Sequence, residues 1–359
     1  MIPRTTDEAL RRLLDEGRAR AAAVDPEHER LWEALVEASG GGKRFRPALV
    51  SAAHEALDGA STTAAMRVGA AVELLHTAFV VHDDVIDGDD LRRGRLNVSG
   101  TFRAQALAAG ATPEGAADYA RTAGILAGDL ALAAAIRAVA TCGATPEVTG
   151  RLLDLFDAAL HTTAAGELVD VRLSLGVEEC TLAESLAMEE HKTSAYSFSL
   201  PLQAGAVLAG ADDAVVERLG EVGRCLGVAF QLADDVLGVF GDPAHTGKSA
   251  TGDLRTAKQT PLLTHARTTA EWPHIVALVG RDLSDDELGE ARRLLTVSGS
   301  RAFVEELAAT HLSTALAQLA ELGIPAETVT GLIGAPAPVA APTSAASTAS
   351  TPDSDGVAA

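Results

Sequence analysis

The stretch "AAMRVGAAVELLHTAFVVHDDVID" (64–87) decides the fold, because it is apolar on nearly every side and yet ends in three aspartates. A helix that is apolar all round belongs inside a bundle. A second stretch, "RLGEVGRCLGVAFQLADDVLGVF" (218–240), has the same character and also carries an Asp-Asp pair. We therefore expect two central helices in an all-α protein, each placing carboxylates beside the core.

Composition supports the all-α expectation. Of the 359 residues 47% are apolar, enough for a large core, and only 3% are aromatic, so helix formers outnumber strand formers. A net charge of -21 excludes a nucleic-acid surface, which needs basic stripes, and suits a cytoplasmic protein. The three cysteines, Cys142, Cys180 and Cys225, are too far apart in sequence to indicate a disulfide framework or a zinc site.

The two ends of the chain differ in character. "MIPRTTDEALRRLLDEGR" (1–18) has no apolar core of a signal peptide, and no run of 18 uncharged apolar residues predicts a membrane span. From 335 to 359 the chain reads "APAPVAAPTSAASTASTPDSDGVAA", which is too poor in large apolar residues to fold. We expect one domain over residues 1–334 and a disordered tail over 335–359.

The aspartates of the first stretch are spaced to converge. Asp83, Asp84 and Asp87 lie within one helical turn, and a carboxylate inside an apolar helix is costly unless something compensates its charge. The second stretch repeats this spacing with Gln231, Asp234, Asp235 and Gly238. Carboxylates without nearby cysteine or histidine favour a hard cation such as Mg²⁺, which binds a few carboxylates together with substrate phosphates. The alternative for each cluster is a solvated helix face.

Two basic groups complete this pattern. "GGGKRFRP" (40–47) carries Lys43, Arg44 and Arg46 in a glycine-led loop, and Arg92, Arg93 and Arg95 follow the first aspartates. Guanidinium groups bind phosphate oxygens in pairs, and lysine adds a point charge. The combination predicts two anions, one bridged through metal and the other held directly by Lys and Arg.

In this order along the chain, several motifs resemble those of the trans-isoprenyl diphosphate synthases, the polyprenyl synthetases, and in particular bacterial geranylgeranyl diphosphate synthases. They are "GGKRFRP", "ELLHTAFVVHDDVIDGDDLRRG", "GELVD", "HKTSAYSFSLPL", "FQLADDVLGVFGD", "TGKSATGDL" and "AKQTPLL". The resemblance spans roughly residues 30 to 330. It implies an all-α isoprenoid synthase fold with helices around a deep central cavity, a homodimer, and head-to-tail condensation of isopentenyl diphosphate with an allylic diphosphate.

The resemblance also implies a role for each motif residue. Three Mg²⁺ ions per active site would be held by Asp83, Asp84, Asp87, Asp234 and Asp235. The allylic diphosphate would contact Arg92, Lys192 and Lys248, with Lys258 nearby. Isopentenyl diphosphate would contact Lys43, Arg46, His76 and Arg93, and Thr193 and Gln231 would be polar groups of the pocket. In this reading the aspartates are metal ligands and not general acids.

Some positions depart from the family pattern. Gly238 stands where many members have a third aspartate, with Asp242 a doubtful substitute, and Glu167 stands where glutamine is common. Leu96 and Asn97 stand where Pro and Thr are common. Metal affinity at the second cluster is therefore the feature that these differences put in question.

Product length depends on the residues below Asp83. Phe79 and Leu75 lie about one and two helical turns deeper, at about 1.5 Å per residue. Members that make C15 products have aromatics at both the fourth and fifth positions before the motif, whereas the fifth position here is Ala78. We therefore expect a C20 product, with C15 or longer products as alternatives. In the other reading of Phe79, it simply packs against a neighbouring helix.

Two functions of other classes remain open. A class I terpene cyclase shares the helical fold but builds its second metal site with asparagine, and Asn97 is the only asparagine in the chain. A non-catalytic helical partner subunit would be expected to lose aspartates, whereas this chain has both clusters.

Overall fold

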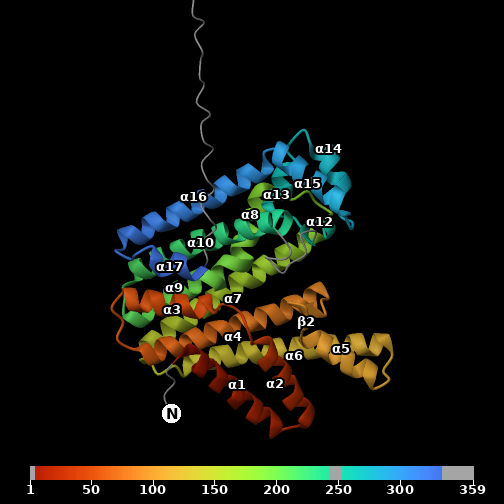
Figure 1. The fold of residues 1–359 in the computed structure, drawn as a ribbon. Helices are drawn as coiled ribbons and strands as arrows, with labels where there is room; N and C mark the ends of the chain where they lie inside the picture. The colour runs from red at the N-terminus through yellow and green to blue at the C-terminus, as the bar shows by residue number, and fades with distance from the viewer. Residues whose placement is uncertain (1–4, 242–251, 334–359) are drawn as a thin grey trace, which may run out of the picture.

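The computed structural model describes residues 5–241 and 252–333, and these are almost entirely helical (Figure 1). Within them, sheet is limited to one antiparallel pair of two-residue strands, so the all-α expectation is confirmed. Lys248, Asp242 and the tail at 335–359 lie outside the described residues.

The first half of the chain forms the lower part of the view in Figure 1. Its elements are α1 (Thr6–Ala22), α2 (Pro26–Ala38), α3 (Phe45–Ala56), α4 (Thr62–Asp87), β1 (Leu91–Arg92), β2 (Arg95–Leu96), α5 (Val98–Ala108), α6 (Pro113–Ala140) and α7 (Pro146–Ser174). The second half contains α8 (Leu182–Glu189), the π-helix η1 (Glu190–Ser199), α9 (Leu200–Ala209), α10 (Asp213–Phe240), α12 (Gly252–Arg255), α13 (Pro261–Ala266), α14 (Trp272–Ile275), the short 3₁₀-helix η2 (Val276–Leu278), α15 (Asp285–Val297), α16 (Ser300–Glu321) and α17 (Glu327–Ile333).

The two aspartate-bearing helices are central, as the sequence predicts. α4 packs along α6 and contacts α3 and α1, while α10 packs along α16 and contacts η1 and α9. Both α4 and α6 are long and apolar enough to cross a membrane, yet 72% of the apolar window of α4 is buried inside the protein. For α6 the buried share is 44%, so this helix keeps an exposed apolar side.

The π-helix η1 lies between α7 and α10, and two glycines allow it to come close to both. A Cβ at Gly166 on α7 would lie 2.3 Å from the backbone nitrogen of Lys192. A Cβ at Gly227 on α10 would lie 2.3 Å from the Ser194 hydroxyl oxygen. Because neither glycine has a side chain, η1 is held tightly between the two helices, and Lys192 is brought next to α7.

The loop after α4 is fixed just as closely. Gly88, with φ of 71°, adopts the left-handed conformation that ends α4 directly after Asp87. Asn97 caps α5, accepting from the Gly100 amide at 2.8 Å, and its Nδ2 donates to the Asp89 carbonyl at 2.7 Å. These contacts hold the β1–β2 turn, which carries Arg92, over the end of α4.

Candidate active site

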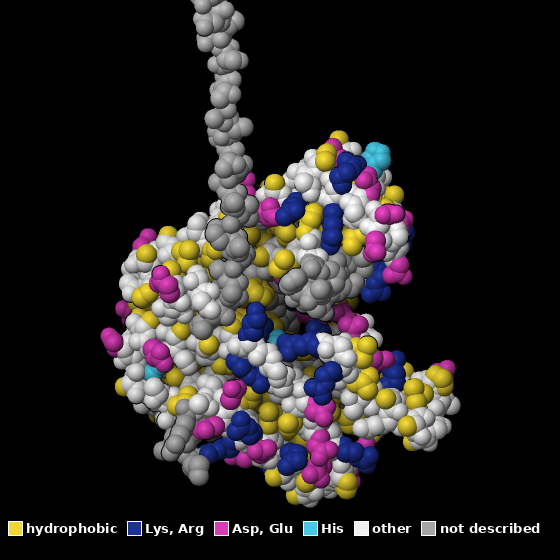
Figure 2. Space-filling view, in the orientation of Figure 1, with side chains coloured by type: hydrophobic (Ala, Val, Ile, Leu, Met, Phe, Trp, Pro, Cys, Tyr) yellow, Lys and Arg dark blue, Asp and Glu magenta, His cyan; other side chains and the backbone are white. Residues whose placement is uncertain are grey.

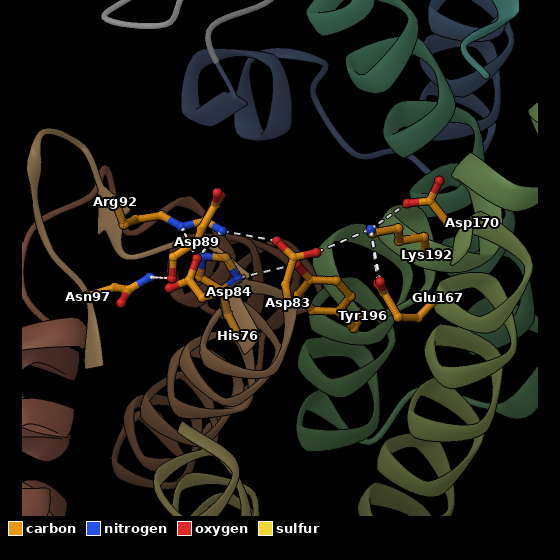
Figure 3. Close-up of polar contacts among 10 residues, drawn as sticks. All are labelled: His76, Asp83, Asp84, Asp89, Arg92, Asn97, Glu167, Asp170, Lys192 and Tyr196. Atoms are coloured by element: carbon orange, nitrogen blue, oxygen red, sulfur yellow. Dashed lines mark hydrogen bonds and ion pairs between the residues drawn. The ribbon is translucent and has the colours of Figure 1, made fainter. Parts of the chain in front are cut away.

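The carboxylates at the end of α4 are paired with two cations. Arg92 donates from Nε to Oδ1 of Asp84 at 2.8 Å and from Nη2 to Oδ2 of Asp83 at 3.0 Å. The Nζ of Lys192 lies 3.2 Å from the other oxygen of Asp83. Figure 3 shows Asp83 between these two cations, with Asp84 beside it. Asp87 is exposed one turn further on, at the same end of the helix.

Lys192 is shared among three carboxylates. Besides Asp83, its Nζ lies 3.0 Å from Glu167 and 2.7 Å from Asp170, both on α7 (Figure 3). Burial works against the charge of Lys192, but the neighbouring carboxylates, led by Asp83 and Asp170, raise its pKa, so it is protonated at neutral pH. This cation therefore connects α4, α7 and η1.

Burial also changes the titration of the carboxylates. It raises the pKa of Asp84 to about 6, although the hydrogen bond from Arg92 works in the opposite direction. Burial likewise raises the pKa of Glu167, against the influence of Lys192. Five carboxyl groups, those of Asp83, Asp84, Asp87, Glu167 and Asp170, and two cations leave this end of α4 with an excess of acidic groups, which is the property of a cation site.

The second cluster lies deeper than the first. Asp235 on α10 is only 2% exposed, and its Oδ1 accepts from the amide of Gln231 at 3.2 Å. Its carboxyl group is also hydrogen-bonded to that of Glu189, and its Oδ2 has no other partner in the described part of the structure. Beside it is Glu189, the last residue of α8, which is 3% exposed. Burial raises the pKa of Asp235 to about 6 and, together with Asp235, raises the pKa of Glu189 well above its usual range.

Among the described residues, Lys258 is the cation that lies in this second group of charged side chains. Burial opposes its charge, but the carboxylates around it, led by Asp235 and Asp253, raise its pKa. Asp234 lies on the same turn of α10 and is half-buried. The structure therefore brings the two predicted metal ligands Asp234 and Asp235 together with Lys258, which was expected near the allylic diphosphate, and with Glu189, which the sequence did not single out.

Another carboxylate occupies the space of the missing third aspartate. A Cβ built on Gly238 would lie 2.3 Å from Oδ2 of Asp253, which comes from α12. Any side chain at position 238 would collide with that carboxylate. Asp253 thus lies where a third aspartate of α10 would begin, which gives a physical reason for glycine at that position.

Asp170 connects the two clusters. Its carboxylate pairs with Lys192 beside the first cluster and also acts on Lys258 and Glu189 beside the second. The ends of α4 and α10 therefore open on one common region. Figure 2 shows a hollow on this face of the molecule with Lys and Arg side chains gathered next to it.

The predicted direct anion site also comes together. The side chain of Arg46 donates from Nε to the Ser197 hydroxyl at 3.0 Å, and His76 lies 3.2 Å from the hydroxyl of Tyr196. Burial lowers the pKa of His76 well below its usual value, and the nearby Arg46 and Arg93 lower it further. His76 is therefore a neutral group surrounded by arginines.

The backbone of the glycine loop (40–42) provides a surface for the Arg93 side chain. A Cβ at Gly41 or Gly42 would lie 3.5 or 3.7 Å from Nη1 of Arg93, so the Arg93 guanidinium rests against this loop. Lys43 in the same loop is exposed, and Thr193 on η1 is half-buried.

Arg44, part of the predicted basic group, has a different environment. It pairs with Glu73 at 2.5 Å and Asp7 at 3.3 Å and donates to the Ser39 carbonyl at 2.8 Å. These contacts join α1, α4 and the end of α2, so Arg44 holds helices together rather than facing the anion site.

The three residues below the first cluster have different neighbours. The ring of Phe79 lies 4.8 Å from the ring of Tyr196, measured between centroids, and Leu75 one turn deeper is fully buried. Ala78 is also buried. It lies one turn before His82, whose ring packs against Gly128 of α6, so Ala78 is on the side of α4 that faces α6.

The donor set fits Mg²⁺. Carboxylate oxygens are its preferred ligands, and three buried oxygens, both of Glu189 and one of Asp235, have no partner among the described residues apart from the contact between these two carboxyl groups. In those residues no three acidic, histidine or cysteine side chains are grouped to hold an ion alone.

Comparison with known proteins gives the same picture. A family model described as polyprenyl synthetase matches residues 28–293. The chain is 33% identical to a geranylfarnesyl diphosphate synthase of Aeropyrum pernix over 77% of this chain and 82% of that protein. It is 34% identical to a (2E,6E)-farnesyl diphosphate synthase of Mycobacterium tuberculosis over 79% of this chain and 75% of the relative.

A solved structure is similar over nearly its full length. It is the crystal structure of a geranylgeranyl pyrophosphate synthase from Corynebacterium glutamicum complexed with isoprenyl diphosphate and magnesium. The TM-score is 0.83 at 29% sequence identity, covering 92% of this chain and 95% of that one.

Proposed function

Because the chain belongs to the polyprenyl synthetase family and is a trans-prenyltransferase, we propose that it condenses isopentenyl diphosphate with an allylic diphosphate to give mainly the C20 product geranylgeranyl diphosphate. The observation that carries the site assignment is the position of Asp83 between Arg92 and Lys192. Through Asp170, the same region reaches the second cluster, so one diphosphate can meet both.

Each half of the site has its own anion. The allylic diphosphate would bind Arg92, Lys192 and Lys258, with Lys248 as a further contact, and three Mg²⁺ ions would lie between it and the two aspartate clusters. Isopentenyl diphosphate would bind Arg46, Arg93 and Lys43, with neutral His76 as a hydrogen-bond partner. Thr193 and Gln231 would complete the polar lining.

The chemistry follows from the charges. Bound Mg²⁺ would supply positive charge that stabilises the departing diphosphate. Arg92 and Lys192 orient that group, so the allylic carbon–oxygen bond breaks to an allylic cation and diphosphate. The double bond of isopentenyl diphosphate attacks the cation, and a proton passes to the released diphosphate. Apolar side chains below Asp83 exclude water, which would otherwise quench the cation.

Phe79 supports the C20 assignment. It is half-buried against Tyr196, and Leu75, one turn deeper on α4, is fully buried. The relatives named above make products on both sides of C20, so homology alone does not set the length. We expect Phe79→Ala to lengthen the product, measured by chromatography of the dephosphorylated products. An unchanged product would show that Phe79 only packs against η1.

Product formation from single starters tests the function as a whole. The purified protein is incubated with Mg²⁺, isopentenyl diphosphate and a C5, C10 or C15 allylic diphosphate. Elongation to C20 supports the proposal. A cyclised hydrocarbon formed without isopentenyl diphosphate would indicate a cyclase, against which stands the use of Asn97 as a helix cap. No product of either kind would favour a partner subunit.

We also propose a homodimer through α5 and α6. Ile125 and Leu126 on α6 and Leu107 on α5 are between 43% and 48% exposed. These three side chains form an exposed apolar stripe, and α6 as a whole is apolar enough to be buried. Burying this stripe against a second copy would remove it from water. Light scattering of Ile125→Asp and Leu126→Asp should show a monomer where the wild type is a dimer. The cytoplasmic location stays a prediction.

A further inference from the structure

Glu189 is an unusual place for a charged side chain. It ends α8 directly before the π-helix η1, it is 3% exposed, and α8 packs against α10 at this point. Its carboxyl group is hydrogen-bonded to that of Asp235, and neither of its oxygens has any other hydrogen-bond partner in the described part of the structure. Two buried carboxyl groups that meet only each other are costly when both are ionised, so either a proton shared between them or a bound cation must compensate their charge.

The neighbour of Glu189 has the same deficit. The carboxyl group of Asp235 is hydrogen-bonded to that of Glu189, and its Oδ2 has no other partner among the described residues. Lys258 acts on both carboxylates, and Asp253 and Asp170 add further negative charge around it. Two adjacent buried carboxyl groups whose free oxygens meet only each other form a pair of hard donors, and a cation can replace the proton between them.

The same place is where α10 lacks a carboxylate of its own. Gly238 carries no side chain, and Oδ2 of Asp253 fills the space in which one would start. The second cluster therefore provides two aspartates from α10, and its additional acidic groups come from other elements. Among these groups Glu189 is almost fully buried, and in the described part of the structure its carboxyl group meets only that of Asp235.

We propose that Glu189 is a further carboxylate of the second metal site, binding the ion itself or the water bound to it next to Asp235. The inference rests on the proposed function, because it takes the second aspartate cluster to be a metal site. It assigns part of the metal affinity to α8, a helix outside both aspartate motifs.

Mn²⁺ binding in the presence of inorganic pyrophosphate tests the inference without turnover. Free Mn²⁺ is measured by electron paramagnetic resonance while the full chain is titrated. For Glu189→Gln we expect the apparent Kd for Mn²⁺ to rise about tenfold to a hundredfold, the range for groups that support a metal ligand. Unchanged affinity in this variant would overturn the inference.

The next residue gives a matched control. Glu190 carries the same charge, but it lines a separate surface groove and pairs with Arg224 at 3.4 Å. Glu190→Gln should bind Mn²⁺ as the wild type does. If both variants weaken binding equally, the effect is one of overall charge, and the assignment of Glu189 is wrong.

Thermal unfolding separates metal binding from a structural role. Without metal, Glu189→Gln should melt at or above the wild-type temperature, because the neutral amide can donate to Asp235 as the protonated acid does and cannot ionise in the buried site. Its gain in melting temperature on adding Mn²⁺ and pyrophosphate should be smaller than that of the wild type. A variant that melts lower without metal but gains as much from Mn²⁺ would show that Glu189 is purely structural.

Elongation and Mn²⁺ binding by the wild type distinguish a failure of this inference from a failure of the proposed function. A wild type that elongates prenyl diphosphates and binds Mn²⁺, together with a Glu189→Gln variant of equal affinity, overturns only the role of Glu189. A wild type that neither elongates nor binds Mn²⁺ with pyrophosphate overturns both.

Discussion

The two aspartate clusters begin from the same sequence signal but reach different electrostatic environments. At the end of α4, Asp83 and Asp84 are paired with Arg92, and Asp83 also with Lys192. At the end of α10, Asp235 is buried against another carboxyl group, that of Glu189. The first cluster is therefore partly compensated by the protein's own cations, whereas the second depends more on an added cation or a shared proton.

This difference suggests a division of labour. The cations around Asp83 are also the groups that would hold the diphosphate, so the first cluster must exchange partners when substrate binds. Asp235 has no such cation in direct contact among the described residues. Its main role would be to bind the metal rather than to contact the diphosphate. Asp83 should therefore matter more for the chemical step, and the second cluster more for metal retention.

The largest expected effect concerns the rate. Asp83→Asn should lower kcat by about 10²–10³-fold, because it removes a carboxylate that touches both Arg92 and Lys192 and would bind metal. Asp235→Asn should lower kcat by only about tenfold, since an amide can keep the hydrogen bond with Gln231. Steady-state rates with saturating Mg²⁺ provide the comparison, with exposed Asp286→Asn as control. Equal losses at Asp83 and Asp235 would break the distinction between the clusters.

Metal removal should affect the second cluster more. Adding EDTA to the protein with Mg²⁺ and pyrophosphate should speed amide exchange near Glu189 and at the end of α10 by about tenfold or more. The end of α4 should change less, because Arg92 and Lys192 remain paired with its aspartates. Hydrogen exchange followed by mass spectrometry measures both regions at once. Greater loosening at α4 would reverse the comparison.

The pH dependence of the metal-free protein sharpens the same point. Burial raises the pKa of Asp235 to about 6, above an unfolded value of about 4, so between these values the folded state binds a proton that the unfolded chain does not. Protonation of Asp235 therefore raises the free energy of unfolding by about 1 kcal/mol as the pH falls from about 7 to about 5. This gain is lost as the pH rises again. Denaturant unfolding should show this gain to be smaller in Asp235→Asn than in wild type and Asp286→Asn. Equal slopes in all three proteins would argue that Asp235 is ionised in the fold.

The smallest effect concerns Lys192. Glu167→Gln removes one of three carboxylates that share this lysine, so pyrophosphate should bind about threefold more tightly. Calorimetry measures the affinity, with Glu178→Gln as a control, since exposed Glu178 pairs with Arg172 away from the site. Weaker binding would mean that Glu167 is needed to orient Lys192 rather than competing for it.

The sequence predicted the parts of the molecule that depend on local spacing. The apolar character of 64–87 and 218–240 indicated central helices, and the helical turn placed Asp83 beside Asp84. The roles of the site residues remain predictions. What the spacing could not provide were contacts between distant segments, such as Glu189 against Asp235, or Asp253 in the space above Gly238. Nor does any local pattern in "EHKTSAYSFS" distinguish a π-helix from an α-helix, because packing against α7 and α10 determines it.

The π-helix also constrains how this chain can change its length. Its turns hold more residues than those of an α-helix, so deleting one residue between Glu190 and Ser199 could restore ordinary winding at little local cost. Such a deletion would rotate the chain before the deletion about the helix axis relative to the chain after it. Lys192 would then no longer contact α7 while Tyr196 remains against His76. Mutant libraries of this protein should therefore change the residue types in this segment and keep its length constant.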